Sequence, residues 1–167
     1  MVSPELIRRY PFFAGLSHEH LATLAGLAED ITVGTGHVFF REDDTIDHFY
    51  LVVEGAIAVF MEIPDRTKDQ PLSGQLTGEL PVHDVIVSTV GSGEVFGWAA
   101  FVPPPVASGG AKAVTPCRVI AFDAARLQEL FDTDCTFGYQ MTQKAATVMR
   151  ERLRDMRIES ITLHHEH

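Results

Sequence analysis

The spacing of hydrophobic positions changes along this chain, and each change predicts a different kind of structure. Leucines and alanines recur at helical spacing over residues 18–29, directly after Ser17, a suitable N-cap, so a helix is predicted there. From residue 31 to residue 122, short apolar runs alternate with turn residues at intervals of about ten residues. That rhythm is typical of antiparallel strands in a roll or sandwich rather than of β-α-β units.

Helical spacing returns in the C-terminal part of the chain. Asp123 and Asp134 are suitable N-caps for a short helix over residues 124–131 and a longer helix over residues 135–158, and we expect a frayed tail over residues 161–167. Apolar residues recur on one face of the longer helix at spacings of four, four, four and three: Met141, Ala145, Met149, Leu153 and Met156. This stripe packs either against the protein's own roll or against a second copy of the chain, and we favour a dimer seam.

Residues 64–84 interrupt the strand pattern with a polar stretch rich in proline and glycine. We expect a long loop or an extended hairpin tip, which is either functional or, as we favour, a tolerated surface insertion. The elements together predict one domain over residues 1–167, of the α+β class and mostly β. Its antiparallel double-stranded β-roll, or jelly roll, covers about residues 31–122, between an N-terminal helix and C-terminal helices over about residues 124–158.

Composition narrows the classes of function. The chain has 167 residues and a formal net charge of −10 with only 13 lysines and arginines, so it is poorly suited to neutralising nucleic-acid phosphates. The N-terminus lacks the apolar stretch of a signal peptide, and no apolar run is long enough to span a membrane. We therefore expect a cytoplasmic protein without membrane contact. Cys117 and Cys135 lack metal-type spacing and are expected to be reduced thiols.

The eight histidines raise the question of a metal site. A cupin, which is also a β-roll, needs a His-x-His pair on a strand with a glutamate and a further histidine, and that spacing is absent from the predicted strands. No nucleophile elbow or Walker loop occurs either. We therefore predict no catalytic residues and no metal ligands, and keep a small cupin-type enzyme as a third alternative.

Three stretches of the sequence carry a family resemblance. The first is PFFAGLS at residues 11–17, followed by the leucine-rich helix. The second is GHVFFREDD at residues 36–44, followed by FYLVVEGAIAV at residues 49–59, and the third is GEVFGWAA at residues 93–100. In this order and spacing they resemble the effector-binding domain of the catabolite-activator/FNR family of cyclic nucleotide-binding proteins, over about residues 10–158.

The resemblance implies a phosphate-binding cassette after the third stretch. In that family a Gly-Glu pair opens a short helix, the glutamate binds the ribose 2′-hydroxyl, and a following arginine, with a serine or threonine after it, pairs with the cyclic phosphate. Here Trp98 occupies the glutamate position, and no arginine occurs between Arg66 and Arg118. Val106, Ala107 or Ser108 must therefore stand where the arginine is expected. Only Ser108 offers a hydroxyl, and Lys112 is the nearest cation. The cassette is therefore degenerate.

The resemblance also implies a pocket between this segment and the long helix, which acts as its lid. The candidate ligand-binding residues are Phe96, Gly97, Trp98, Ala99, Ala100, Ser108, Lys112, Met156 and Arg157. Trp98 either stacks on a ligand ring or fills the vacated pocket as a core aromatic, and we favour filling. Each lost charge-assisted hydrogen bond is worth about 1.5–3 kcal/mol, so losing two would weaken cyclic AMP binding by about two to four orders of magnitude.

The run GWAAFVPP at residues 97–104 resembles a bacterial subgroup of the same family, with many stand-alone binding domains. Few residues follow the long helix, so we expect no helix-turn-helix module and no DNA binding. We expect a non-enzymatic regulatory sensor domain, homodimeric through its C-terminal helix, whose effector is a cyclic nucleotide or another small anion. The alternative is a structural or protein-interaction module, with an unknown protein partner, that has lost small-molecule binding.

Overall fold

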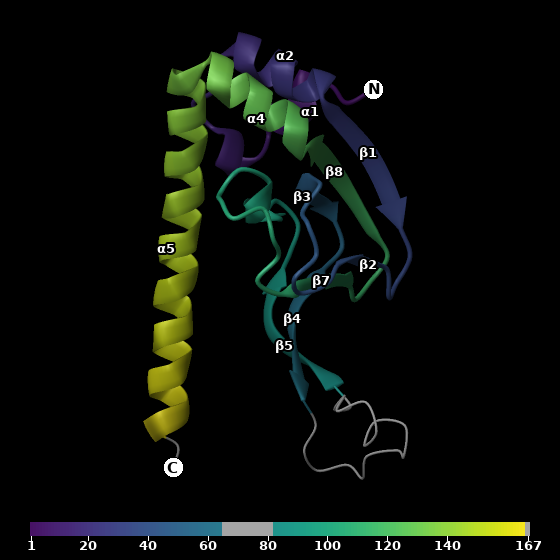
Figure 1. Ribbon diagram of the computed structural model, residues 1–167, viewed down its shortest axis with the longest axis vertical. Coiled ribbons are helices and arrows are strands. Elements are labelled where there is room, and N and C mark those ends of the chain that lie inside the picture. The colour runs from purple at the N-terminus through teal and green to yellow at the C-terminus, as the bar shows by residue number, and fades with distance from the viewer. Residues whose placement is uncertain (65–81, 166–167) are drawn as a thin grey trace.

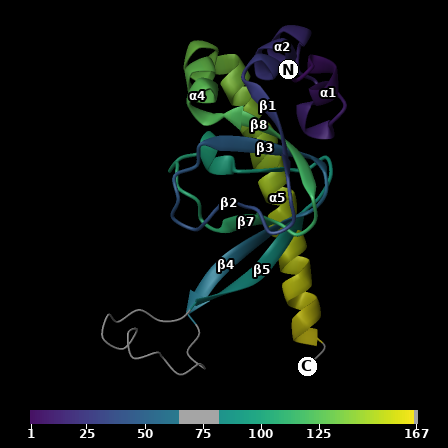
Figure 2. The ribbon, with the colours of Figure 1, turned by 90° about the vertical axis from the view of Figure 1, so that its right-hand side faces the viewer.

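Antiparallel strands form two sheets that pack into the predicted roll (Figures 1 and 2). The structure, a computed structural model, describes residues 1–64 and 82–165. In one sheet the strand order is β1-β8-β3-β6, from Ala28–Val33, Cys117–Asp123, His48–Glu54 and Val95–Phe96. In the other it is β2-β7-β4-β5, from Val38–Phe40, Gly110–Ala113, Ile57–Pro64 and Val82–Val90. The α+β class and the jelly-roll architecture are confirmed.

Helices gather at one end of the roll, and the longest of them runs along its side (Figure 1). The short elements before the first strand are α1 (Pro4–Arg8), η1 (Pro11–Phe13) and α2 (His18–Gly26). After the last strand come α4 (Ala124–Thr133) and α5 (Cys135–His165), and η2 (Trp98–Ala100) lies between β6 and β7. The predicted caps are confirmed: the side chains of Ser17, Asp123 and Asp134 accept hydrogen bonds from backbone amides three residues ahead.

Several element boundaries differ from the expected ones. Helix α2 ends at Gly26 rather than at residue 29, because Ala28 already pairs with Phe122 in the sheet. Helix α5 continues past residue 158 to His165. The expectation of a frayed tail from residue 161 is therefore wrong for residues 161–165. Most of the expected loop over residues 64–84 lies outside the described residues, and β4 and β5 pair as a hairpin as far as Pro64 opposite Val82.

The apolar stripe of the long helix divides between two environments. Met141 and Ala145 are buried in the larger core cluster, together with residues of α2, β3, β8 and α4, and Met149 packs partly against it. Leu153 and Met156 are 48% and 54% exposed. The first half of the stripe therefore packs against the protein's own roll, whereas the second half has no partner within the described part of the chain.

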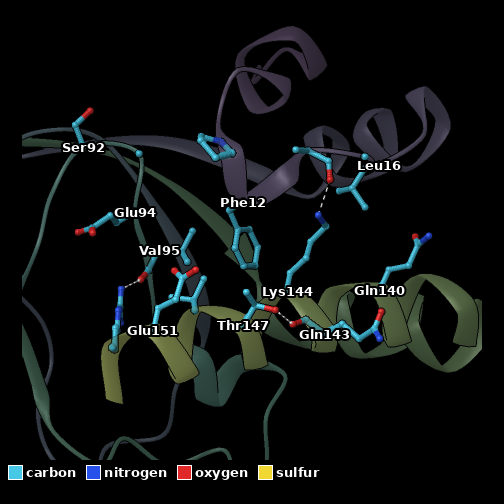
Figure 3. A pocket seen from close by; sticks show the side chains of 16 residues that line it. Phe12, Leu16, Ser92, Glu94, Val95, Gln140, Gln143, Lys144, Thr147 and Glu151 are labelled. Atoms are coloured by element: carbon cyan, nitrogen blue, oxygen red, sulfur yellow. Dashed lines mark hydrogen bonds between the residues drawn. The ribbon is translucent and has the colours of Figure 1, made fainter. Parts of the chain in front are cut away.

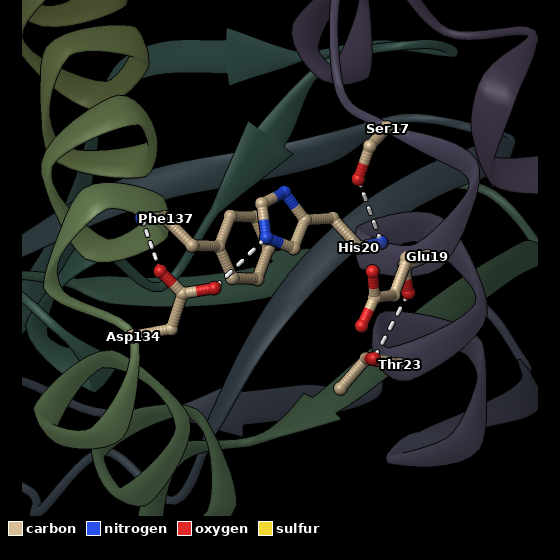
Figure 4. A network of polar contacts seen from close by, with 6 residues as sticks. All are labelled: Ser17, Glu19, His20, Thr23, Asp134 and Phe137. Atoms are coloured by element: carbon tan, nitrogen blue, oxygen red, sulfur yellow. Dashed lines mark hydrogen bonds and ion pairs between the residues drawn. The ribbon is translucent and has the colours of Figure 1, made fainter.

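A polar contact fixes the start of α5 to α2 (Figure 4). The His20 ring stacks on the Phe137 ring with centroids 4.0 Å apart, and its Nε2 lies 3.0 Å from Asp134 Oδ2. The other carboxylate oxygen of Asp134 accepts a hydrogen bond from the Phe137 amide at 3.1 Å. The Phe137 amide, and after it the His20 side chain, hold the pKa of Asp134 below its ordinary value. One carboxylate thus caps the helix and ties it to the N-terminal helices.

Replacing this carboxylate tests its role. Asp134→Ala removes the cap and the contact to His20, and we expect the melting temperature at pH 7 to fall by about 2–4 °C. A carboxylate whose pKa is depressed by folding stabilises the fold above its unfolded pKa of about 3.9, and this stabilisation is lost as the pH falls through the lower folded value. The difference between the wild-type protein and the variant should therefore shrink below about pH 4.

Thermal unfolding followed by circular dichroism between pH 3 and pH 8 measures this difference. Asp132→Ala is the matched control, because that carboxylate is exposed near the same helix junction and makes neither contact. A stability difference for Asp134→Ala that stays constant down to pH 3 would contradict a role for the ionised carboxylate.

Candidate functional site

The segment that carries the family resemblance turns sharply at Gly97. The backbone of Gly97 has φ +84°, and an added Cβ atom would lie 2.8 Å from the His48 carbonyl oxygen and 3.2 Å from Tyr50 Cδ2. Directly before it, the buried Phe96 ring stacks on Tyr50 with centroids 4.7 Å apart. Glycine is therefore required at this position for both conformation and space, and it directs the chain from β6 into η2.

A cavity of about 160 Å³ lies beside this turn. Its wall combines the segment after β6, the segment before and at the start of β7, residues of the roll and one residue of α5. The lining residues are Phe40, Ile46, Val59, Ser88, Phe96, Gly97, Trp98, Ala99, Val106, Ala107, Ser108, Gly109, Gly110 and Arg152. Segments that are far apart in the sequence thus meet where the resemblance places an effector.

The cavity brings together some of the predicted residues and leaves others outside. Phe96, Gly97, Trp98, Ala99 and Ser108 line it. The remaining candidates, Ala100, Lys112, Met156 and Arg157, do not.

Each of these outer residues has a different environment. Ala100 is buried, and its carbonyl accepts a hydrogen bond from the Gln128 side chain at 3.2 Å. Lys112 Nζ lies 3.2 Å from Asp84 Oδ2 and 4.9 Å from the centroid of the Phe60 ring, so its charge is already engaged. Met156 is exposed on α5, and so is its neighbour Arg157. The helix therefore meets the cavity about one turn before the expected position.

Arg152 is the residue of α5 that reaches the cavity, and the sequence analysis did not identify it. Its Nη2 donates a hydrogen bond to the Val95 carbonyl at 2.8 Å, and its guanidinium carbon lies 5.9 Å from the centroid of the Trp98 ring. Burial lowers the pKa of Arg152, and the nearby charge of Glu94 partly opposes this effect. The sequence does contain a signal for this residue. Arg152 stands three residues after Met149, so the two side chains are neighbours on the same side of the helix as the apolar stripe.

Trp98 contributes to the core and to the cavity at the same time. Its ring lies 5.3 Å from Phe49, 5.7 Å from Phe12 and 6.0 Å from Phe101 between centroids. Its Nε1 is buried and has no acceptor among the residues that the structure describes, although most buried indole nitrogens have one. The aromatic side chain packs against the core but leaves the cavity beside it open.

A larger cavity of about 790 Å³ lies between η1, residues 92–95 and α5 (Figure 3). Several of its polar side chains are already engaged within the protein: Lys144 Nζ donates to the Ala14 carbonyl, and Glu94 Oε2 accepts from the Gly91 amide at 2.7 Å. Arg152 lines this cavity as well as the smaller one, so its side chain is part of the wall that they share. None of the candidate ligand-binding residues is among the described residues that line the larger cavity.

Two further observations concern cofactors and membranes. In the part of the chain that the structure describes, no three or more His, Cys, Asp or Glu side chains are grouped so that they could hold a metal ion. None of the helices over residues 1–64 and 82–165 has both the length and the apolar character needed to cross a bilayer.

Comparisons with known proteins agree with this geometry. The model of the cyclic nucleotide-binding domain family matches residues 31–134. A proposed cyclic nucleotide-binding protein from Geobacter metallireducens is 28% identical with a TM-score of 0.75, over 92% of this chain and 99% of that one. No curated protein matches the chain.

Two more distant structures share the fold. A cyclic nucleotide-binding domain from Methylobacillus flagellatus is 16% identical with a TM-score of 0.71, over 95% of this chain and 80% of that one. The catabolite activator protein of Thermus thermophilus is 20% identical with a TM-score of 0.64, over 92% of this chain and 62% of that one.

The turn at Gly97 gives a direct test of the site's construction. Gly97→Ala forces a side chain into left-handed backbone and against the His48 carbonyl, so we expect a loss of about 1–3 kcal/mol in the free energy of unfolding. Urea denaturation measures it. Gly34→Ala is the control, because a Cβ atom there meets nothing within 4 Å. Equal stability of the two variants would show that the turn does not need glycine.

Proposed function

Because this chain belongs to the cyclic nucleotide-binding domain family, we propose that it is a regulatory sensor domain whose effector is a small anion in the cavity beside Gly97 and Trp98. One observation carries the proposal: the cavity is bounded on one side by the cassette segment and on the other by Arg152 of α5. A ligand there contacts the roll and the helix together, so binding changes how the helix packs. We assign the chain a regulatory role rather than an enzymatic one on the basis of its family.

The effector differs from an ordinary cyclic nucleotide. Trp98 replaces the cassette glutamate that would bind a ribose hydroxyl, and Ser108 lies in the region where the phosphate-binding arginine is expected. The cavity of about 160 Å³ is also smaller than the roughly 300–1,000 Å³ of most small-molecule sites. These features support an anion smaller than cyclic AMP.

The second half of α5 supports a homodimer. From residue 153 onward every described residue of α5 is exposed, and Figure 1 shows the helix continuing along the side of the roll. Met149, Leu153, Met156, Ser160 and Leu163 follow one another at spacings of four, three, four and three. This is the spacing of a coiled-coil seam, and its largely apolar character suits a second copy of the same helix.

The remaining assignments rest on the family and on composition. The net charge of −10 argues against a nucleic-acid partner for this domain. Cys117 and Cys135 are both unpaired thiols, which is the usual state in a reducing compartment, so we place the domain in the cytoplasm.

A ligand screen tests the sensor function. Thermal shift and calorimetry with cyclic AMP, cyclic GMP, cyclic di-GMP, inorganic phosphate and small organic acids should yield at least one stabilising anion. The single tryptophan, Trp98, makes fluorescence a report from the cavity wall. Cyclic AMP should bind about two to four orders of magnitude more weakly than it binds a complete cassette.

Absence of any response would favour the alternative, an interaction module that has lost small-molecule binding. In that case the packing of Trp98 against Phe12 and Phe49 would be its whole role.

The dimer seam gives a separate prediction. Leu153→Glu with Met156→Glu places charges on the seam, so we expect a dimeric wild-type protein to become monomeric in sedimentation equilibrium. Ile158→Glu is the matched control, because Ile158 is similarly exposed but lies on the opposite face of α5. A monomeric wild-type protein, or a double variant that remains dimeric, would contradict the seam.

A further inference from the structure

Arg152 is an arginine without an acidic partner in an acidic protein. Across residues 1–64 and 82–165, no carboxylate oxygen lies within ion-pair distance of its guanidinium, which bonds only to the neutral Val95 carbonyl. By contrast, Arg118 pairs with Asp30 at 2.7 Å and Arg41 with Glu62 at 2.6 Å. A guanidinium carries five N–H donors, so most of those on Arg152 remain unused. A half-buried cation in this state is a site for an anion.

The rest of the cavity wall offers donors but no negative charge. Among the described residues that line it, Arg152 is the charged one, and no aspartate, glutamate or histidine accompanies it. Ser88 and Ser108 contribute hydroxyl groups, and Trp98 contributes an indole whose Nε1 lacks an acceptor. The other lining side chains are aliphatic or aromatic. A fitting ligand therefore has an anionic head that accepts hydrogen bonds and an apolar body.

The size of the cavity limits that body. A volume of about 160 Å³ is close to that of a cavity of about 150 Å³ known to hold a benzene molecule. A single ring or a short branched chain fits this space, and a purine joined to a ribose phosphate does not.

We propose that Arg152 binds the carboxylate of a small aromatic or branched aliphatic acid whose apolar body occupies the cavity beside Phe96 and Trp98. This deepens the proposed function and rests on it, since it names the ligand class and the anchoring residue of the same site. A carboxylate accepts two parallel hydrogen bonds from a guanidinium, which supplies both affinity and orientation. The residue that binds the anion therefore lies on α5 and not in the cassette segment.

The position of Arg152 also explains how such an acid would act on the helix. Its Nη2 bond to Val95 joins α5 to β6 directly before Phe96 and Gly97. A carboxylate on the unused donors of the same guanidinium lies directly beside this bond. Binding therefore adds a contact between helix and ligand next to the contact between helix and sheet.

Calorimetry with benzoate and 3-methylbutanoate, each against its uncharged amide, tests the proposal on the intact wild-type chain. We expect the acids to bind and the amides to bind at least tenfold more weakly. Arg152→Gln should weaken binding of the acids by about tenfold to a hundredfold. Arg152→Lys, which keeps the charge but not the fork, should fall between. Arg154→Gln is the control, an exposed arginine on the same helix that does not line the cavity.

The outcomes separate this inference from the function on which it rests. Equal binding of the acids to the wild-type protein and to folded Arg152→Gln would overturn the role of Arg152 and leave the sensor function standing. Binding of a cyclic nucleotide but of neither acid would overturn the ligand class alone. If none of the anions in either experiment binds, the sensor function itself fails, and this inference fails with it. The comparison of acids with amides needs no variant, so poor folding of a variant cannot obscure the result.

Discussion

The position of the cavity and the exposure of the helix end both depend on how much of α5 packs against the roll. Its first turns are held firmly, since Phe137, Met141 and Ala145 are buried and Asp134 ties the helix start to His20. Arg152 is the last partly buried residue of the helix, and its bond to Val95 is the last hydrogen bond that the described part of α5 makes to a strand. Beyond it the helix is exposed as far as His165. A helix anchored at one end and free at the other can transmit a small change at the boundary.

The cavity lies at this boundary, and its charge is the reverse of the protein's own. Arg41, Lys112 and Arg118 form ion pairs with carboxylates. Such exposed pairs contribute little to stability and are screened by salt. Arg152 is more buried and unpaired, so its interaction with an anion is stronger and less sensitive to salt than theirs. The net charge of −10 slows the approach of anions but does not remove the affinity within the cavity.

The sequence predicted the roll well because its signals are local. Alternating apolar runs defined the strands, and Ser17, Asp123 and Asp134 marked helix starts that the structure confirms. The site was harder, because its residues come from distant parts of the chain, from Phe40 to Arg152. Lys112 was chosen for its charge, yet Asp84 on the neighbouring hairpin pairs with it. Arg152 was not among the predicted residues, because helical spacing does not show which residues beside an apolar stripe still touch the roll.

The same spacing links the cavity to the proposed seam. Arg152 immediately precedes Leu153, the first exposed member of the heptad pattern. Consecutive helical residues are about 100° apart around the axis, so a rotation that moves Arg152 toward a ligand turns Leu153 and the seam with it. The size of such an effect is bounded, because a ligand shifts the equilibrium between two helix positions only by its difference in affinity for them. A carboxylate on the guanidinium that also bonds to the Val95 carbonyl provides that difference, since its two parallel hydrogen bonds form best in one position of the helix.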